Sequence, residues 1–300
     1  MAMGKKYNIL VSRSGTVLIV VLLAVTLMTA FIVEFAFGIY VSTTAINNWS
    51  TSQKASLLAK SGISLAVAYT KRNINRYGYS YPGKATLPFP EPFSGEEGDI
   101  TLLIEDETGK LNINALVYPN GLTNERIYDQ MRRLCTYLDV PTSMVDIITD
   151  WIDPDQEPRV RDSEDGAKNS ALWTLGELYS IPGIEQEWIQ TLLPYITLYG
   201  DGKINFNAAD EPVLASLFDD VGLASERAEK IMKRRLEAPI TSASINRLFA
   251  DLGLPKPPWA IVKGTHFRLI STGIIGEVKR VVDAVIQVDK RYQINYWREY

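Results

Sequence analysis

The chain has 300 residues, a formal net charge of -4 and hydrophobic residues at 46% of its positions. This length predicts one or two domains with a sizeable core, and the negative net charge leaves no general footprint for nucleic acid. The single cysteine, Cys135, excludes an internal disulfide bond, and one cysteine with one histidine, His266, excludes a zinc site of the usual kind. Both residues are expected to have structural roles.

An uncharged apolar run, residues 16–33, follows a basic leader that contains Lys5, Lys6 and Arg13 and no acidic residue. As a helix this run spans about 27 Å, close to the hydrocarbon thickness of a bilayer. Positive charge before the span predicts a single-pass protein with a cytoplasmic amino end and its remaining chain outside.

The helical pattern continues beyond the membrane, because apolar residues recur at spacings of three and four. One long helix is therefore expected over residues 16–77, with residues 16–36 as its transmembrane half. The predicted buried stripe of the other half consists of Ala55, Leu58, Gly62, Leu65 and Tyr69.

The order of basic leader, Gly15 and apolar helix resembles a type IV prepilin-like signal. A secretory signal peptide would end its apolar stretch at a cleavage site made of small residues. We therefore expect prepilin peptidase to remove residues 1–15, which leaves an N-methylated Thr16 as the first residue. A plain membrane anchor is the alternative interpretation of this region.

The rest of the chain changes from strands to helices and back to strands. Loop and first strands are expected over residues 78–121, a helical block over 122–263 and C-terminal strands over 264–300. This order predicts an α+β, pilin-like fold. A long N-terminal helix packs on an antiparallel β-sheet, and a large all-α insertion domain lies between the strands.

An acidic segment, residues 150–165, lies in the helical block. Its candidate metal ligands are Asp153, Asp155, Glu157, Glu164 and Asp165. Carboxylate clusters favour Ca²⁺ over Mg²⁺. The first four candidates imitate positions one, three, five and twelve of an EF-hand, but Pro158 stands where the sixth position needs glycine. The residues leave open a calcium loop of another shape or a solvated acidic loop.

Several motifs together resemble the K-type minor pseudopilin of type II secretion systems, over nearly the whole mature chain. These are residues 150–158 (DWIDPDQEP), the Ser-Glu-Asp run at 163–165, and two Asn-x-Asn runs at 112–114 and 205–207. The resemblance implies a non-enzymatic subunit of the periplasmic pseudopilus, anchored in the bacterial inner membrane with a periplasmic head. It also implies calcium in the helical domain.

The resemblance further implies partners and a position. The partners are the I- and J-type minor pseudopilins and, through them, H and the major pseudopilin G. Pseudopilins generally carry Glu at the fifth mature position to pair with the amino terminus of the subunit above, whereas this chain has Val20. An unpaired carboxylate within the membrane costs several kcal/mol. Val20 and the wide insertion therefore fit a subunit at the tip, which has no subunit above it and primes assembly.

Three other functions compete with this interpretation. A hydrolase could use Asp153 and Asp155 with a metal ion, but the sequence contains no Gly-rich phosphate loop. A helix-hairpin-helix unit, expected over residues 203–235, could bind DNA, but Asp219 and Asp220 lie where phosphates should approach, so no nucleic-acid partner is expected. The closest alternative is a minor type IV pilin at a pilus tip, with an adhesive or DNA-binding role.

Overall fold

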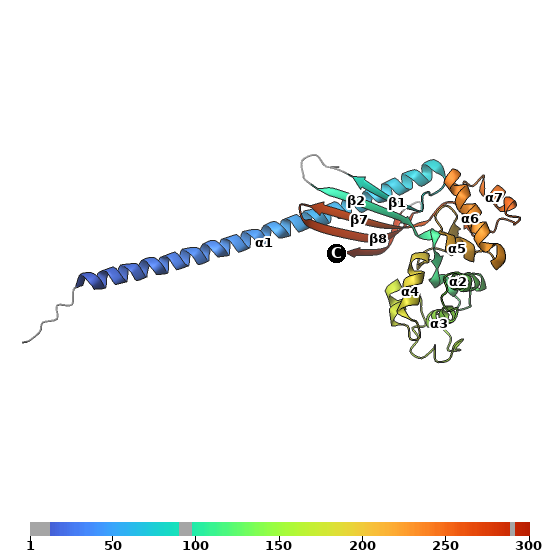
Figure 1. Cartoon of the computed structure of the whole chain (residues 1–300), viewed down its shortest axis with the longest axis horizontal. Helices are drawn as coiled ribbons and strands as arrows, with labels where there is room; N and C mark the ends of the chain where they lie inside the picture. Colours follow the sequence, from blue (N-terminus) through green and yellow to red (C-terminus); the bar gives the residue numbers. More distant parts are fainter. Residues whose placement is uncertain (1–12, 90–97, 289–291) are drawn as a thin grey trace, which may run out of the picture. The chain divides into compact units, whose positions relative to one another are not determined.

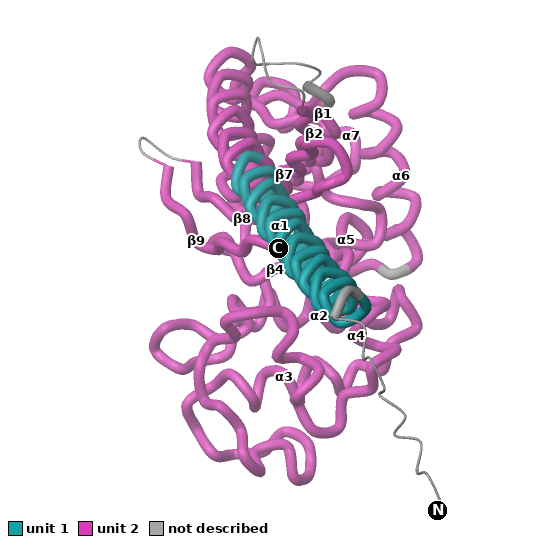
Figure 2. Tube along the Cα trace, turned by 90° about the vertical axis from the view of Figure 1, so that its left-hand side faces the viewer, with its two compact units in different colours: residues 1–54 teal, residues 55–300 magenta. Residues whose placement is uncertain are grey.

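The computed structural model describes residues 13–89, 98–288 and 292–300. It consists of two compact units, Met1–Lys54 and Ala55–Tyr300, which are coloured separately in Figure 2. Most of the expected prepilin leader, including Lys5 and Lys6, lies outside the described residues.

Helix α1 runs without interruption from Arg13 to Tyr77. In the first unit, residues 15–49 of this helix are all exposed, and α1 is the one helix in the described parts of the chain that is long and apolar enough to cross a membrane. Gly15, Thr16 and Val20 all lie in this exposed part of α1.

The second unit contains a five-stranded antiparallel sheet in the order β1-β2-β7-β8-β9. Its strands are β1 (Lys84–Phe89), β2 (Asp99–Asp106), β7 (His266–Ile275), β8 (Val278–Val288) and β9 (Tyr292–Glu299). The C-terminal strands expected over residues 264–300 are β7, β8 and β9, and the tight turn between β7 and β8 has Gly276 at φ +57°. The proline and glycine residues around β1 favour a loop. The structure instead has a short edge strand there, a place where proline is tolerated.

The part of α1 from Ala55 onward packs on one face of this sheet. Ala59, Ile63 and Ala66 are buried against Leu102 and Val282. The buried stripe therefore differs from the predicted one: Ala55 and Gly62 are buried, but Tyr69 is 40% exposed. Small residues occupy the centre of the contact because the helix and the sheet approach closely there.

Two glycines make this close approach possible. A Cβ atom on Gly273 of β7 would lie 2.4 Å from the carbonyl oxygen of Ala55 and 2.8 Å from the amide nitrogen of Ala59. A Cβ atom on Gly62 would lie 2.1 Å from Ser271 Oγ. The helix can therefore rest directly on the backbone of β7.

The chain leaves the sheet after β2 and returns at β7, so the whole insertion lies between two adjacent, antiparallel strands. Figure 1 shows its helices gathered at one end of the sheet. They are α2 (Glu125–Tyr137), α3 (Ser143–Ile152), α4 (Gln186–Leu192), α5 (Glu211–Ser216), α6 (Val221–Glu237) and α7 (Ile245–Asp251). The expected α+β, pilin-like fold with an inserted helical domain is confirmed.

The insertion also contains short elements besides its α-helices. Two parallel ladders form, between β3 (Leu111–Asn112) and β4 (Ile196–Thr197) and between β5 (Ile204–Asn205) and β6 (Ala260–Ile261). Four 3₁₀ helices are Glu107–Gly109, Ile113–Leu116, Leu175–Ser180 and Leu193–Tyr195. A core separate from that under α1 includes Met131, Leu134 and Phe206.

Asp106 marks the point where the insertion leaves the sheet. Its buried carboxylate accepts hydrogen bonds from Ser80 Oγ (2.8 Å), Asn205 Nδ2 (2.7 Å) and the backbone amide of Thr108 (3.0 Å). Burial raises the pKa of Asp106, although these hydrogen bonds oppose the shift. The carboxylate therefore joins three segments that are distant in the sequence.

Candidate metal centre

The acidic segment begins in the last turn of α3. The side chain of Asp150 points from this turn into the protein interior. Asp153 caps the C-terminus of the helix just before Pro154. Both carboxylates are almost completely buried, with side-chain exposures of 0% and 1%. Burying two carboxylates side by side is costly unless they are paired.

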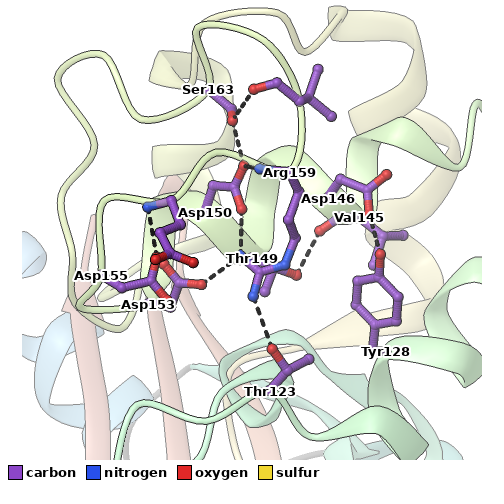
Figure 3. Close-up of polar contacts among 12 residues, drawn as sticks. Thr123, Tyr128, Val145, Asp146, Thr149, Asp150, Asp153, Asp155, Arg159 and Ser163 are labelled. Atoms are coloured by element: carbon purple, nitrogen blue, oxygen red, sulfur yellow. Dashed lines mark hydrogen bonds and ion pairs between the residues drawn. The ribbon is translucent and has the colours of Figure 1, made fainter.

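Arg159 supplies that pairing, as Figure 3 shows. Its Nη1 atom lies 2.5 Å from Asp150 Oδ1 and 2.6 Å from Asp153 Oδ2, and its backbone amide donates to Asp150 Oδ2 at 2.8 Å. Nη2 donates to Thr123 Oγ1 at 2.9 Å. Burial disfavours the charged guanidinium, but the hydrogen bonds to the two carboxylates outweigh burial and raise the pKa of Arg159.

Three of the five predicted metal ligands come together beside this pair. One carboxylate oxygen each from Asp153, Asp155 and Glu164 lies within 4.8 Å of the other two. Glu157 and Asp165 are exposed and outside this group. Glu157 instead contributes its backbone amide, which donates to Asp155 Oδ1 at 2.8 Å.

Several oxygens in the acidic segment are buried without a hydrogen-bond partner among the described residues. They are Asp153 Oδ1 and both carboxylate oxygens of Glu164. Burial raises the pKa of Asp153, although the hydrogen bond from Arg159 opposes this shift. Burial also raises the pKa of Glu164, and the negative charges of Asp153, Asp150 and Asp155 raise it further. Hard oxygen ligands with excess negative charge are the donor set that Ca²⁺ prefers. The residues therefore fit a calcium ion.

The two Asn-x-Asn runs hold the loops of the insertion together. Asn112 Nδ2 donates to the carbonyl of Gly200 (2.6 Å), and Asn114 exchanges two hydrogen bonds with the backbone of Leu172 (2.8 and 2.9 Å). In the second run, Asn207 exchanges two hydrogen bonds with the backbone of Ile240 (2.7 and 2.8 Å). The motifs identified in the sequence thus have a structural role.

The hairpin between α5 and α6 carries acidic groups where a phosphate would have to bind. Asp220 accepts a hydrogen bond from the backbone amide of Gly222 and so caps α6. Asp219 forms an ion pair with Arg133 at 2.9 Å. On α6 itself, Lys230 and Lys233 pair with Glu226 and Glu229 at 2.7 Å. This arrangement does not favour a DNA phosphate.

Cys135 and His266 both have structural surroundings. Cys135 is completely buried in the core of the insertion, and burial raises its pKa to about 12. His266 Nδ1 lies 2.9 Å from Thr265 Oγ1, and burial lowers its pKa. Neither residue belongs to the acidic group.

A long exposed apolar helix that continues onto an antiparallel sheet, with a helical domain inserted between two of its strands, defines a pilin-like subunit. Residues 109–201 match the family model described as Type II secretion system (T2SS), protein K. The chain is 27% identical to the Type II secretion system protein K of Pseudomonas aeruginosa, over 93% of this chain and 90% of that protein.

The fold is also similar to a chain in the crystal structure of the GspK-GspI-GspJ complex from the Type 2 Secretion System of enterotoxigenic Escherichia coli. The TM-score is 0.60 at 21% identity, and the match covers 86% of this chain and 99% of that chain. The resemblance inferred from the sequence is thus confirmed. The chain is similar to Type II secretion system protein K along nearly its whole length, and its fold is that of the solved relative.

Proposed function

We propose that this chain is a minor pseudopilin that occupies the tip of the periplasmic pseudopilus and primes its assembly with the I- and J-type minor pseudopilins. The observation that carries the proposal is the insertion between β2 and β7, a folded domain with its own core. A filament stacks its subunits closely, so a head widened in this way is best accommodated where no further subunit follows. The solved relative, in a complex with GspI and GspJ, supports these partners.

The first half of α1 would anchor the subunit and later contact neighbouring helices. We propose that prepilin peptidase cleaves before Thr16, that the amino end faces the cytoplasm and that the head is periplasmic. Val20 stays apolar at the fifth mature position, where a carboxylate would have no amine to pair with at the tip. Contacts with H and the major pseudopilin G would follow through I and J.

Labelled filaments test the tip position. Pseudopili assembled in cells that produce the full chain with a C-terminal epitope tag should bind antibody at one end only, as seen by electron microscopy. Label distributed along the filament would contradict the proposal. A filament of a tagged major pseudopilin, labelled along its length, is the matched control.

We further propose that the acidic group binds Ca²⁺ and that the ion stabilises the head without taking part in a reaction. Asp153, Asp155 and Glu164 would supply ligands, since their facing oxygens are close together and largely without hydrogen-bond partners. Arg159 already forms ion pairs with Asp150 and with one oxygen of Asp153, but it carries only one positive charge. The remaining negative charge is what a cation would neutralise, with an expected dissociation constant on the order of 10⁻⁴ to 10⁻³ M.

Calcium should therefore raise the melting temperature of the head at millimolar concentration, and a chelator should reverse the effect. Asp155→Asn should abolish most of the shift. Asp162→Asn is the matched control, because Asp162 belongs to the same loop but lies outside the three-carboxylate group. Equal calcium shifts in both variants, or no shift in the unmodified chain, would contradict the assignment.

A further inference from the structure

Among the described residues, strand β9 forms one edge of the sheet and pairs only with β8. Figure 2 shows it beside β8 at the margin of the second unit. Seven of its eight residues are exposed, and it contains neither proline nor lysine. The opposite edge strand, β1, carries Lys84 and Pro88, which are typical protections of a sheet edge against further pairing. β9 contains neither of these two residues; its charged residues are Arg298 and Glu299, and the irregularity in its pairing with β8 lies before Trp297.

The free edge of β9 can be identified from its hydrogen bonds. Tyr300, which directly follows the strand, exchanges both backbone hydrogen bonds with Val281 of β8 (2.8 and 3.0 Å). Backbone groups alternate between the two sides of a strand. The amides and carbonyls of Trp297 and Glu299 therefore point away from β8, and no described residue pairs with them in the sheet.

Side chains on both faces of β9 offer further contacts. On the face that α1 covers, Tyr292 is 52%, Ile294 48% and Trp297 41% exposed. On the other face, Tyr296 and Arg298 help to line a cavity of about 260 Å³ between the sheet and the insertion. A strand added to β9 would thus find contacts for alternate side chains on each face.

Trp173 lines the same cavity and is 79% exposed, yet it is held in place. Its backbone amide donates to Glu177 Oε1 at 2.6 Å, and the ammonium of Lys168 lies 4.3 Å from the centre of its ring. Exposed tryptophans with fixed positions are common energetic centres of protein interfaces.

Three charged residues line the cavity, and the acidic one, Glu107, is already paired with Lys110 at 3.2 Å. The guanidinium of Arg268 is already paired with both oxygens of Asp283, at 2.9 and 2.6 Å. Arg298 has no carboxylate partner among the described residues, and its guanidinium lies 5.5 Å from the centre of the Tyr300 ring. A carboxylate that enters the cavity would therefore find Arg298 available.

We propose that β9 pairs with an extended segment of a partner minor pseudopilin, which adds a sixth strand to the sheet and directs a carboxylate side chain toward Arg298. This inference rests on the proposed function. A second copy of the chain fits less well, because its own β9 would bring another Arg298. The acidic residue of that strand, Glu299, is already bound to Lys60 at 2.9 Å.

Two substitutions at one position separate the backbone contact from the side-chain contact. Trp297→Ala and Trp297→Pro both remove the indole ring, but only proline also removes the outward amide, and neither changes an amide that pairs with β8. In full chains co-purified in detergent with the I and J proteins of the same system, Trp297→Pro should weaken the complex about tenfold more than Trp297→Ala.

Trp173→Ala and Arg298→Glu should also weaken the complex. Leu236→Ala is the matched control: Leu236 is 73% exposed on α6, outside β9 and the cavity. Its complex should match that of the unmodified chain. Equal retention of the alanine and proline variants at position 297, or a crosslinked β9–β9 dimer in place of the mixed complex, would overturn the proposal.

Hydrogen exchange of the unmodified chain gives a second test that does not depend on a variant folding. The amides of Trp297 and Glu299 should exchange quickly in the free protein and slowly in the complex. If the complex forms and these amides stay fast, the added strand is wrong while the proposed function stands. If no complex forms at all, both fail.

Discussion

At the level of single residues, the structure of the acidic segment depends on Arg159. Replacing it with alanine leaves the carboxylates of Asp150 and Asp153 buried and unpaired. We expect Arg159→Ala to lower the free energy of unfolding by about 3–5 kcal/mol, measured by urea denaturation without calcium.

Arg161→Ala is the control for this substitution. Arg161 belongs to the same segment, but its side chain is 93% exposed and its ion pair with Asp162 lies at the surface. Its loss should change the free energy of unfolding by less than about 0.5 kcal/mol. A similar effect of both substitutions would show that Arg159 does not stabilise the buried carboxylates.

Asp106 predicts a dependence of stability on pH. Its pKa is raised in the folded protein, chiefly by burial. Folding therefore favours the protonated form, and this contribution to stability is present at low pH and lost as pH rises above 3.8 through the folded pKa. Asp106→Asn cannot ionise, so the stability of the unmodified chain relative to this variant should decrease over that range.

Denaturation of both proteins at a series of pH values from about 3.5 to 7 measures this difference. Subtracting the two curves removes the other carboxylates, which both proteins share. A difference that stays constant, or that increases with pH, would contradict the raised pKa.

Sequence patterns located the acidic segment of the candidate metal centre, but they did not show how its residues are arranged. The acidic composition of residues 150–165 was visible, and so was the spacing of Asp153 and Asp155. The bridging role of Arg159 was not, because side-chain pairing across a loop has no period in the sequence. Glu157 lies outside the three-carboxylate group because of the path of the loop. Backbone conformations such as the positive φ of Asp162 (64°) help to set this path.

Among the helices and strands, the contact between α1 and β7 requires Gly273. An added methyl group would lie 2.4 and 2.8 Å from backbone atoms of Ala55 and Ala59, which cannot move unless the helix moves. We expect Gly273→Ala to destabilise the head by about 1–3 kcal/mol, measured by thermal or urea unfolding.

Gly38→Ala makes the same chemical change at a position with no atom within 4 Å of the added methyl group. It should leave the unfolding of the head unchanged. If Gly273→Ala were equally neutral, the close contact between helix and sheet would be wrong.

The helices and strands show where sequence patterns are sufficient. Alternating apolar residues in the sequence indicated β8, although residues 281–286 of this strand are all buried. The stripe predicted for α1 was wrong at Tyr69, which fits the helical period but is exposed, because the contact selects small residues such as Ala59 and Ala66. Strands of two residues, such as β5 and β6, are too short to show any period.

For the complete protein, the proposed anchoring, assembly and position in the filament all require that the apolar helix from Thr16 onward is kept in the mature chain. The helix and the head with its inserted domain then act as one subunit. A cleaved signal peptide would release the head without an anchor or an assembly helix.

The mass and amino-terminal sequence of the mature chain, isolated from the membranes of cells with an active prepilin peptidase, test this requirement directly. We expect a polypeptide that begins at Thr16 and carries one added methyl group at its amino terminus. A mature chain that begins beyond Glu34 would contradict the proposed function.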